Sequence, residues 1–393
     1  MRLPLFLIIL LLVAGVVIDC YIFFAIKRYS RNKVWLYTHI ALSSLLYLMM
    51  LCVMFMPVRT GSDTMLRSVM WMVYTFLTVY ASKLVFIIVD LISRLPLFWK
   101  KKPWKGVSVG GAALATVIFL TMWWGALFNR FNIDVRRVDV KIENLPKAFD
   151  GFTIAQISDL HVGTYGSDTV FLHNLVERIN ELKPDLIVFT GDIVNRKSDE
   201  LKPFVSTLAG LKAPYGVYSI LGNHDYGDYV DWDNPSQKTQ NLAQLKDLQR
   251  KMGWRLLNNE YAPIVSGTDT LMLVGVENVG DPPFHTYGDL AKAYPTPADS
   301  LTKILLTHNP AHWHNDISGH KGMEFDLTLA GHTHAMQCEL FSLSPAAMRY
   351  DEWGGIYDDG DGRRLYVNIG TGTVGIPARI GATPEITLIT LRR

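Results

Sequence analysis

The chain has 393 residues, and its 38 Lys and Arg nearly balance its 36 Asp and Glu. This balance hides two unlike parts, because residues 1–130 hold 14 basic and 3 acidic side chains and the remainder holds 24 basic and 33 acidic ones. An acidic second part argues against nonspecific nucleic-acid binding, which needs clustered Lys and Arg. The three separated cysteines do not suggest a disulfide framework.

The first part contains four apolar stretches, each long enough to cross a bilayer as a helix of ~20 residues. We place these spans at 4–26, 34–56, 66–93 and 107–128. A cleaved signal peptide is the alternative for the first span, but its leading segment has only Arg2 and the apolar run continues through Ile26. We therefore expect a membrane domain at 1–130 and a second domain at 131–393.

The loops between the spans predict the orientation of the membrane domain. Basic residues crowd the loops after the first and third spans, whereas the loop between the second and third carries only Arg59 and Arg67, with Asp63 beside them. Short basic loops stay in the cytoplasm. We therefore expect an integral protein of the bacterial inner membrane, with its N-terminus and everything after residue 130 on the extracytoplasmic side.

Asp19, Lys83 and Asp90 are ionisable residues that lie inside the spans, where charges are costly and usually paired. The first and third spans run in the same direction, which brings Asp19 and Lys83 to similar depths. We expect these two to form a stabilising pair rather than a proton or ion pathway. Asp90 and His39 lie nearer the cytoplasmic surface, where snorkelling of the side chains suffices as an explanation.

The second part reads as alternating strands and helices. Alternation of apolar and charged residues over 135–142 predicts an edge strand, and helical spacing predicts helices at 168–182, 199–211 and 239–252. Further strands are predicted at 262–265, 271–276, 303–307, 326–330, 365–369 and 385–391. This pattern predicts an α/β domain with two packed mixed sheets and helices outside them.

Five short apolar runs in this part each end in side chains that bind metals. They are 154–157 before Asp159 and His161, 186–190 before Asp192, 217–221 before Asn223, 304–307 before His308, and 327–330 before His332 and His334. Such runs are typical of buried strands, and α/β sheets bind ligands at the carboxyl ends of their strands. The sequence therefore predicts that these side chains meet in a metal site.

These blocks resemble the motifs of the calcineurin-like metallophosphoesterase superfamily. They stand here as Asp159-Leu160-His161, Gly191-Asp192, Gly222-Asn223-His224-Asp225, His308 and Gly331-His332-Thr333-His334. The resemblance covers residues 131–393, and the sequence around His308 and over residues 375–386 is similar to that of the membrane-associated bacterial branch. One departure is Ala335-Met336, where this branch often has two glycines, and it puts the shape of the adjacent pocket wall in question.

The resemblance implies a site that holds two divalent metals. Asp192 would bridge them, with Asp159, His161 and His334 completing one metal and Asn223, His308 and His332 completing the other. Such mixed ligands suit Mn, Fe or Zn, and we favour Mn²⁺. A bridging carboxylate is expected to use both of its oxygens.

The resemblance also implies a catalytic role for His224 as a general acid or as a group that stabilises the leaving oxygen, with Asp225 orienting it. A loop histidine without such a role is the alternative reading. Arg196 and Arg379 are candidates to hold a substrate phosphate, and a surface ion pair is the alternative for each.

The expected activity is hydrolysis of a phosphoester or pyrophosphate bond by metal-activated water, and a membrane-anchored site favours a lipid-linked substrate. Activities of this branch include hydrolysis of phosphodiesters and of UDP-diacylglucosamine pyrophosphate. The latter is a cytoplasmic reaction, which conflicts with the predicted orientation. The alternatives are a phosphatase or phosphodiesterase for soluble nucleotides or phosphomonoesters, and a non-catalytic metal-binding sensor or scaffold. The membrane is the expected partner, and the oligomeric state is left open.

Overall fold

The computed structural model describes residues 5–57, 59–281, 285–295, 300–320 and 322–393. The predicted first span begins at Pro4, which lies outside these residues. Contacts divide the chain into two compact units. One comprises Met1–Leu127 with Gly375–Ala378, and the other comprises Phe128–Val374 with Arg379–Arg393.

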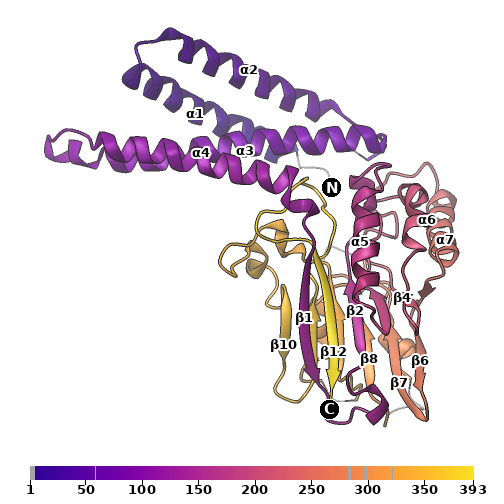
Figure 1. The fold of residues 1–393 in the computed structure, drawn as a ribbon. Helices are drawn as coiled ribbons and strands as arrows, with labels where there is room; N and C mark the ends of the chain where they lie inside the picture. Colours follow the sequence, from indigo (N-terminus) through magenta and orange to yellow (C-terminus); the bar gives the residue numbers. More distant parts are fainter. Residues whose placement is uncertain (1–4, 58, 282–284, 296–299, 321) are drawn as a thin grey trace. The chain divides into compact units, whose positions relative to one another are not determined.

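The first unit is built from four long apolar helices (Figure 1). They are α1 (Leu5–Tyr29), α2 (Lys33–Phe55), α3 (Asp63–Ser93) and α4 (Lys105–Leu127). Each is long and apolar enough to cross a membrane, and each falls close to a predicted span. Asn32 and Ser62 mark the starts of α2 and α3, because each accepts a hydrogen bond from a backbone N–H in the first turn of its helix.

The predicted pair inside the membrane unit is confirmed. Lys83 Nζ on α3 lies 2.6 Å from Asp19 Oδ1 on α1. Tyr47 and Tyr80 each donate a hydrogen bond of 2.7 Å to the other oxygen of Asp19, and His39 Nε2 lies 3.2 Å from its backbone carbonyl. The carboxylate on α1 is therefore satisfied by groups from the two neighbouring helices α2 and α3, as a charge inside a membrane requires.

The second unit is α/β, with two mixed sheets that each have six strands among the described residues. The first sheet runs in the order β1 (Asp134–Lys141), β12 (Glu385–Arg392), β2 (Thr153–Ile157), β3 (Leu186–Phe189), β4 (Val217–Ser219) and β5 (Arg255–Leu256). The second runs in the order β10 (Gly355–Asp358), β11 (Arg364–Val367), β9 (Leu327–Ala330), β8 (Lys303–Leu306), β7 (Asp269–Gly275) and β6 (Glu260–Ser266). The expected edge strand is confirmed as β1.

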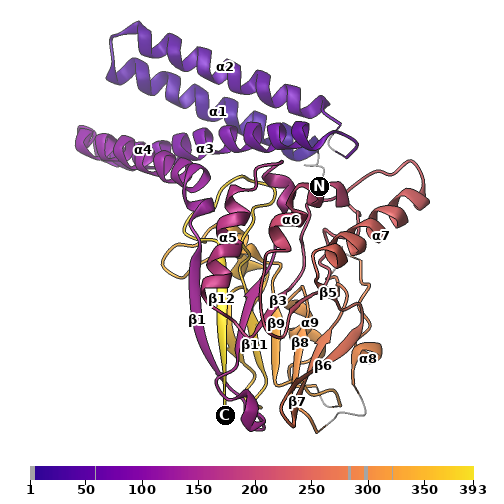
Figure 2. The same cartoon turned by 45° about the vertical axis from the view of Figure 1, so that its right-hand side comes forward.

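The two sheets pack face to face, with helices on their outer faces (Figure 2). Alternate residues of one strand serve different layers: Ile154 of β2 packs between the sheets, whereas Ala155 faces the helical side. Helices α5 (Val170–Glu181), α6 (Val205–Leu208) and α7 (Pro235–Lys251) cover the first sheet. Helices α8 (Leu290–Ala293) and α9 (Ala311–Asp316) pack on the second.

The predicted helix at 199–211 is wrong in type and length. Residues Ser198–Phe204 form a 3₁₀ segment, followed by the single helical turn of α6. Pro203 is inside this stretch, and its missing N–H and fixed φ prevent a continuous α-helix. The short strands β5 and β10 were not predicted, because neither carries an apolar run.

Candidate metal centre

The candidate ligands follow the carboxyl ends of five strands, three in the first sheet and two in the second. Asp159 and His161 follow β2, Asp192 follows β3, Asn223 follows β4, His308 follows β8, and His332 and His334 follow β9. Strands β2, β3 and β4 are parallel to one another, as are β8 and β9. Because parallel strands end at the same edge, the fold brings all seven predicted side chains together.

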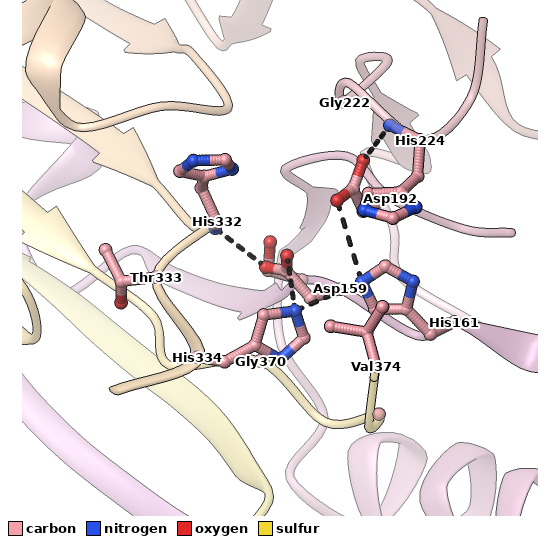
Figure 3. Close-up of polar contacts among 12 residues, drawn as sticks. Asp159, His161, Asp192, Gly222, His224, His332, Thr333, His334, Gly370 and Val374 are labelled. Atoms are coloured by element: carbon pink, nitrogen blue, oxygen red, sulfur yellow. Dashed lines mark hydrogen bonds and ion pairs between the residues drawn. The ribbon is translucent and has the colours of Figure 1, made fainter. Parts of the chain in front are cut away.

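The first group of ligand atoms comes from Asp159, His161 and His334, which lie within 4.8 Å of one another (Figure 3). The Nε2 atoms of the two imidazoles are 3.0 Å apart. Asp159 Oδ1 lies 3.2 Å from Nε2 of His334. All three side chains are buried, so their lone pairs converge on one point away from solvent.

The second group comes from Asp192, His308 and His332, whose ligand atoms also lie within 4.8 Å of one another. Nδ1 of His332 is 3.2 Å from Nε2 of His308. Asn223 belongs to the same group, because its Oδ1 lies 3.1 Å from Nε2 of His308. This group therefore combines two imidazoles, a carboxylate and an amide oxygen.

Asp192 joins the two groups through a single oxygen. Its Oδ2 lies 3.2 Å from Nε2 of His308 and 3.6 Å from Nε2 of His161. Its Oδ1 instead accepts a hydrogen bond of 2.8 Å from the backbone N–H of His224. Oδ2 is therefore the oxygen that faces both groups, and use of both oxygens by a bridging carboxylate stays a prediction.

The chemistry of these side chains fits divalent metal ions. Asp159 Oδ1 is buried and faces Nε2 of His334 at 3.2 Å, and a buried carboxylate is strongly unfavourable unless a positive charge compensates it. Imidazole nitrogens facing one another at 3.0 Å present lone pairs to a common point. A cation between these atoms satisfies both observations, and the mixed N and O donors suit Mn, Fe or Zn.

The two carboxylates and the imidazoles shift each other's pKa. Burial opposes charge on Asp159 and Asp192, but the neighbouring His334 and His308 hold the pKa of both carboxyls below its usual value. Burial likewise opposes charge on His308, but Asp192 and Asp159 outweigh it and raise the pKa of His308 to about 9. Without a metal, His308 therefore carries a proton at neutral pH.

Several ligands have backbone conformations in the left-handed region. The φ angles are 53° at Asp159, 44° at His161, 61° at Asp192, 75° at His332 and 51° at His334. Such conformations cost of order 1–3 kcal/mol each outside glycine and cluster at functional sites. They let a chain leaving a strand turn at once, which aims alternate side chains at the centre.

The departure at Ala335-Met336 has a structural counterpart. These residues have φ of 50° and 46°, a conformation that glycine adopts without strain. The backbone path that two glycines would take is thus also available to this pair. The Met336 side chain is 44% exposed, so it does not serve as core packing.

Two glycines allow the ligand loops to approach each other closely. A Cβ atom on Gly222 would lie 2.2 Å from Oδ1 of Asp192, and one on Gly331 would lie 1.9 Å from Oγ of Ser158. Both distances are far below van der Waals contact. Any larger residue at these positions must displace the loops that hold Asp192 and Asp159.

A second layer of hydrogen bonds orients the ligands. The Thr190 carbonyl lies 2.8 Å from Nδ1 of His308, which leaves Nε2 of that ring for a metal. The hydroxyl of Tyr350 lies 2.9 Å from Nε2 of His332. Asn223 donates from Nδ2 to the hydroxyl of Tyr229 at 2.7 Å, which turns its oxygen toward the centre. The two tyrosines were not predicted. Tyr229 lies six residues after Asn223, whereas no local sequence signal marks Tyr350.

His224 is adjacent to the ligands, but Asp225 does not orient it. Nδ1 of His224 lies 2.6 Å from the carbonyl of Asn195, and its ring stacks on Tyr229 with centroids 4.2 Å apart. The Asp225 carboxylate instead accepts hydrogen bonds from the backbone N–H groups of Asp192, Ile193, Val194 and Gly222. Asp225 therefore positions the turn that carries Asp192, the residue that faces both ligand groups.

Arg379 is not placed to bind a substrate phosphate. It is fully buried, and its guanidinium donates to the carbonyls of Ile369, Gly372 and Ala382. Burial lowers the pKa of Arg379 to about 10, so it remains charged and organises the loop around it. Arg196 is also buried, with Nε 3.9 Å from the carboxylate of Glu200. Its predicted contact with substrate stays a prediction.

Comparisons with known proteins agree with these observations. The family described as "Calcineurin-like phosphoesterase" matches residues 152–336. A second family, "Probable Calcineurin-like phosphoesterase, transmembrane domain", matches residues 1–130. The matches cover both parts of the chain that composition distinguishes.

Individual relatives point the same way. The chain is 32% identical over 277 residues to the uncharacterized metallophosphoesterase YkuE of Bacillus subtilis, covering 66% of this chain and 86% of that protein. It is 31% identical over 284 residues to UDP-2,3-diacylglucosamine pyrophosphatase LpxG of Chlamydia trachomatis, covering 60% and 80%. A zebrafish (Danio rerio) transmembrane protein with metallophosphoesterase domain is 30% identical over 266 residues, covering 65% of this chain and 56% of that protein. The chain therefore belongs to the calcineurin-like metallophosphoesterases and carries the transmembrane domain of their membrane-bound members.

Proposed function

We propose that this protein is a membrane-anchored phosphohydrolase whose centre holds two divalent metals and cleaves a phosphoester or pyrophosphate bond. The observation that carries the proposal is the pair of buried ligand groups that share Oδ2 of Asp192. Asp159, His161 and His334 would hold one ion, and Asn223, His308 and His332 the other. When bound, two such ions acidify a water molecule and neutralise charge on the phosphoryl oxygens.

The chain's own contribution to the reaction is proton handling by His224. Because the Asn195 carbonyl occupies Nδ1, Nε2 is the atom that can exchange a proton with the leaving oxygen. Burial lowers the pKa of His224, although the Asp192 carboxylate opposes this shift. A lower pKa makes the protonated ring scarcer but a stronger acid, which favours donation to a basic leaving group.

Mn²⁺ is the metal we favour. The proposed ligands are carboxylate, amide and imidazole groups without a thiolate, and this set suits Mn, Fe and Zn better than Ca or Cu(I). Metal removal by a chelator should abolish activity, and restoration by Mn²⁺ beyond that by Zn²⁺ or Fe²⁺ would identify the ion.

We favour a lipid-linked phosphate or pyrophosphate as substrate. The support is the membrane unit of this chain and the name of the Chlamydia relative, a pyrophosphatase of a diacylated sugar nucleotide. A soluble nucleotide or phosphomonoester is the second candidate, because the metals that these ligands would hold bind a phosphoryl group and not its substituent.

The basic loops favour a catalytic domain on the extracytoplasmic side of a bacterial inner membrane. Fusion of an exported phosphatase and of a fluorescent protein to Arg393 tests this orientation. An active phosphatase and a dark fluorescent protein are expected. The opposite pair of results would contradict the orientation and favour a cytoplasmic substrate.

The function is tested by phosphate release from the detergent-solubilised full chain with Mn²⁺. The panel includes UDP-diacylglucosamine, other lipid phosphates, nucleotides and bis-p-nitrophenyl phosphate, and Asp192→Asn is the control for a contaminating hydrolase. Metal-dependent turnover that the control lacks supports the proposal. Wild-type turnover no higher than that of Asp192→Asn on every substrate would favour a non-catalytic role.

A further inference from the structure

A cavity of about 810 Å³ lies within the membrane unit, at the end of the helices that carries the basic loops. Its walls come from the last turns of α1, the end of α3 and the start of α4. Ile22, Ala25, Ile26, Phe86, Val109 and Ala112 supply an apolar surface. Arg28, Arg94 and Lys105 line the same cavity, so it joins a long apolar wall to a cluster of cations.

Asp90 fixes two of these cations in place. Its carboxylate is fully buried and receives Nη1 of Arg28 at 3.2 Å and Nε of Arg94 at 3.0 Å. Tyr29 and Ser108, which also line the cavity, donate to its other oxygen at 2.7 Å each. Snorkelling therefore does not explain Asp90, because the carboxylate is enclosed and serves to hold the arginines at the cavity wall.

The cations exceed what Asp90 neutralises. Arg28, Arg94 and Lys105 carry three positive charges against one carboxylate. Nη2 of Arg94 is buried without a hydrogen-bond partner among the described residues, and Lys105 forms no ion pair with a described residue. A guanidinium nitrogen left free in this way is suited to a phosphate oxygen.

We propose that this cavity binds an anionic diacyl phospholipid. The phosphate would contact Arg94 and Lys105, and an acyl chain would lie against the apolar wall formed by α1 and α4. Charge complementarity favours this ligand, because the headgroup of a zwitterionic lipid would add a positive charge to a site where positive charges already outnumber negative ones. The inference does not depend on the metal centre or on the proposed reaction.

The test measures lipid retention by the full chain in detergent, using native mass spectrometry with dioleoylphosphatidylglycerol and dioleoylphosphatidylcholine. One phosphatidylglycerol should be retained in preference to phosphatidylcholine. Lys105→Gln should weaken retention roughly fivefold, as expected for one basic residue near a membrane surface. Lys101→Gln is the matched control, because Lys101 is exposed in the loop just before α4 and does not line the cavity.

A second variant pair tests the apolar wall. Ala112→Phe fills the cavity and should reduce retention, whereas Ala113→Phe adds the same ring at a neighbouring position that does not line it. Millimolar inorganic phosphate distinguishes a lipid from a free phosphate ion. Displacement of phosphatidylglycerol by phosphate, equal retention of both lipids, or unchanged retention in Lys105→Gln and Ala112→Phe would each overturn the proposal.

Discussion

The substitution Gly222→Ala tests whether close approach of two loops builds the metal centre. The added Cβ would lie 2.2 Å from Oδ1 and 2.6 Å from the backbone nitrogen of Asp192, and 2.7 Å from Cε1 of His308. Ordinary contact begins at 3.4 Å, so the Asp192 carboxylate must move by about 1.2 Å. Misplacement of a reacting group by 1 Å can cost roughly 10²-fold in rate, and Asp192 serves both ligand groups.

We therefore expect Gly222→Ala to lose metal and to lose turnover by at least about 10²-fold. Metal content is measured by plasma mass spectrometry and turnover with bis-p-nitrophenyl phosphate. Gly106→Ala is the control, because a Cβ there meets nothing within 4 Å. Circular dichroism checks that the variant is folded. A folded Gly222→Ala protein with full metal content and turnover would refute the argument from loop approach.

Three further predictions address the proton donor, the ligands and the membrane pair. His224→Asn should retain metal but lower turnover roughly 10²–10⁴-fold on an alkyl phosphodiester. The loss should be much smaller on p-nitrophenyl esters, and equal losses of turnover on both substrates would show that His224 is not the proton donor. Since the pKa of metal-free His308 is about 9, Mn²⁺ must displace the His308 proton, and the affinity for Mn²⁺ should rise with pH between 7 and 9. Calorimetry in buffers of different ionisation enthalpy should detect the released proton, and a Mn²⁺ affinity that does not change with pH would contradict this prediction. Asp19→Asn and Lys83→Met should each lower the thermal stability of the solubilised protein, and the double variant should lose less stability than the sum of the two single losses. Additive losses would mean that the two side chains, although 2.6 Å apart, do not stabilise each other.

Local sequence patterns were sufficient to predict which side chains the fold brings together, because each candidate ligand closely follows a strand. The apolar runs before Asp159, Asp192 and His308 predict buried strands, and parallel strands end at one edge. The distribution of the strands between two sheets was not needed for this result. The prediction required only that the carboxyl ends of these strands meet, and they do so in the fold.

The roles of Asp225 and Arg379 could not be predicted in the same way. Whether a carboxylate faces an imidazole or a set of backbone N–H groups depends on how the 191–194 turn folds back on Gly222. The burial of Arg379 depends on carbonyls as far away as Ile369. The contact between Tyr350 and His332 likewise joins segments whose approach no local pattern encodes.

Asp192 would hold two metals, because its Oδ2 faces both ligand groups. The most direct test of this arrangement is electron paramagnetic resonance of the full chain titrated with Mn²⁺, combined with metal analysis. We expect two Mn²⁺ per chain and a spin-coupled spectrum, which is typical of ions ~3.5–4 Å apart, and we expect Asp192→Asn to lose the coupling. A wild-type protein that binds one ion or none, or two ions without coupling, would contradict this arrangement.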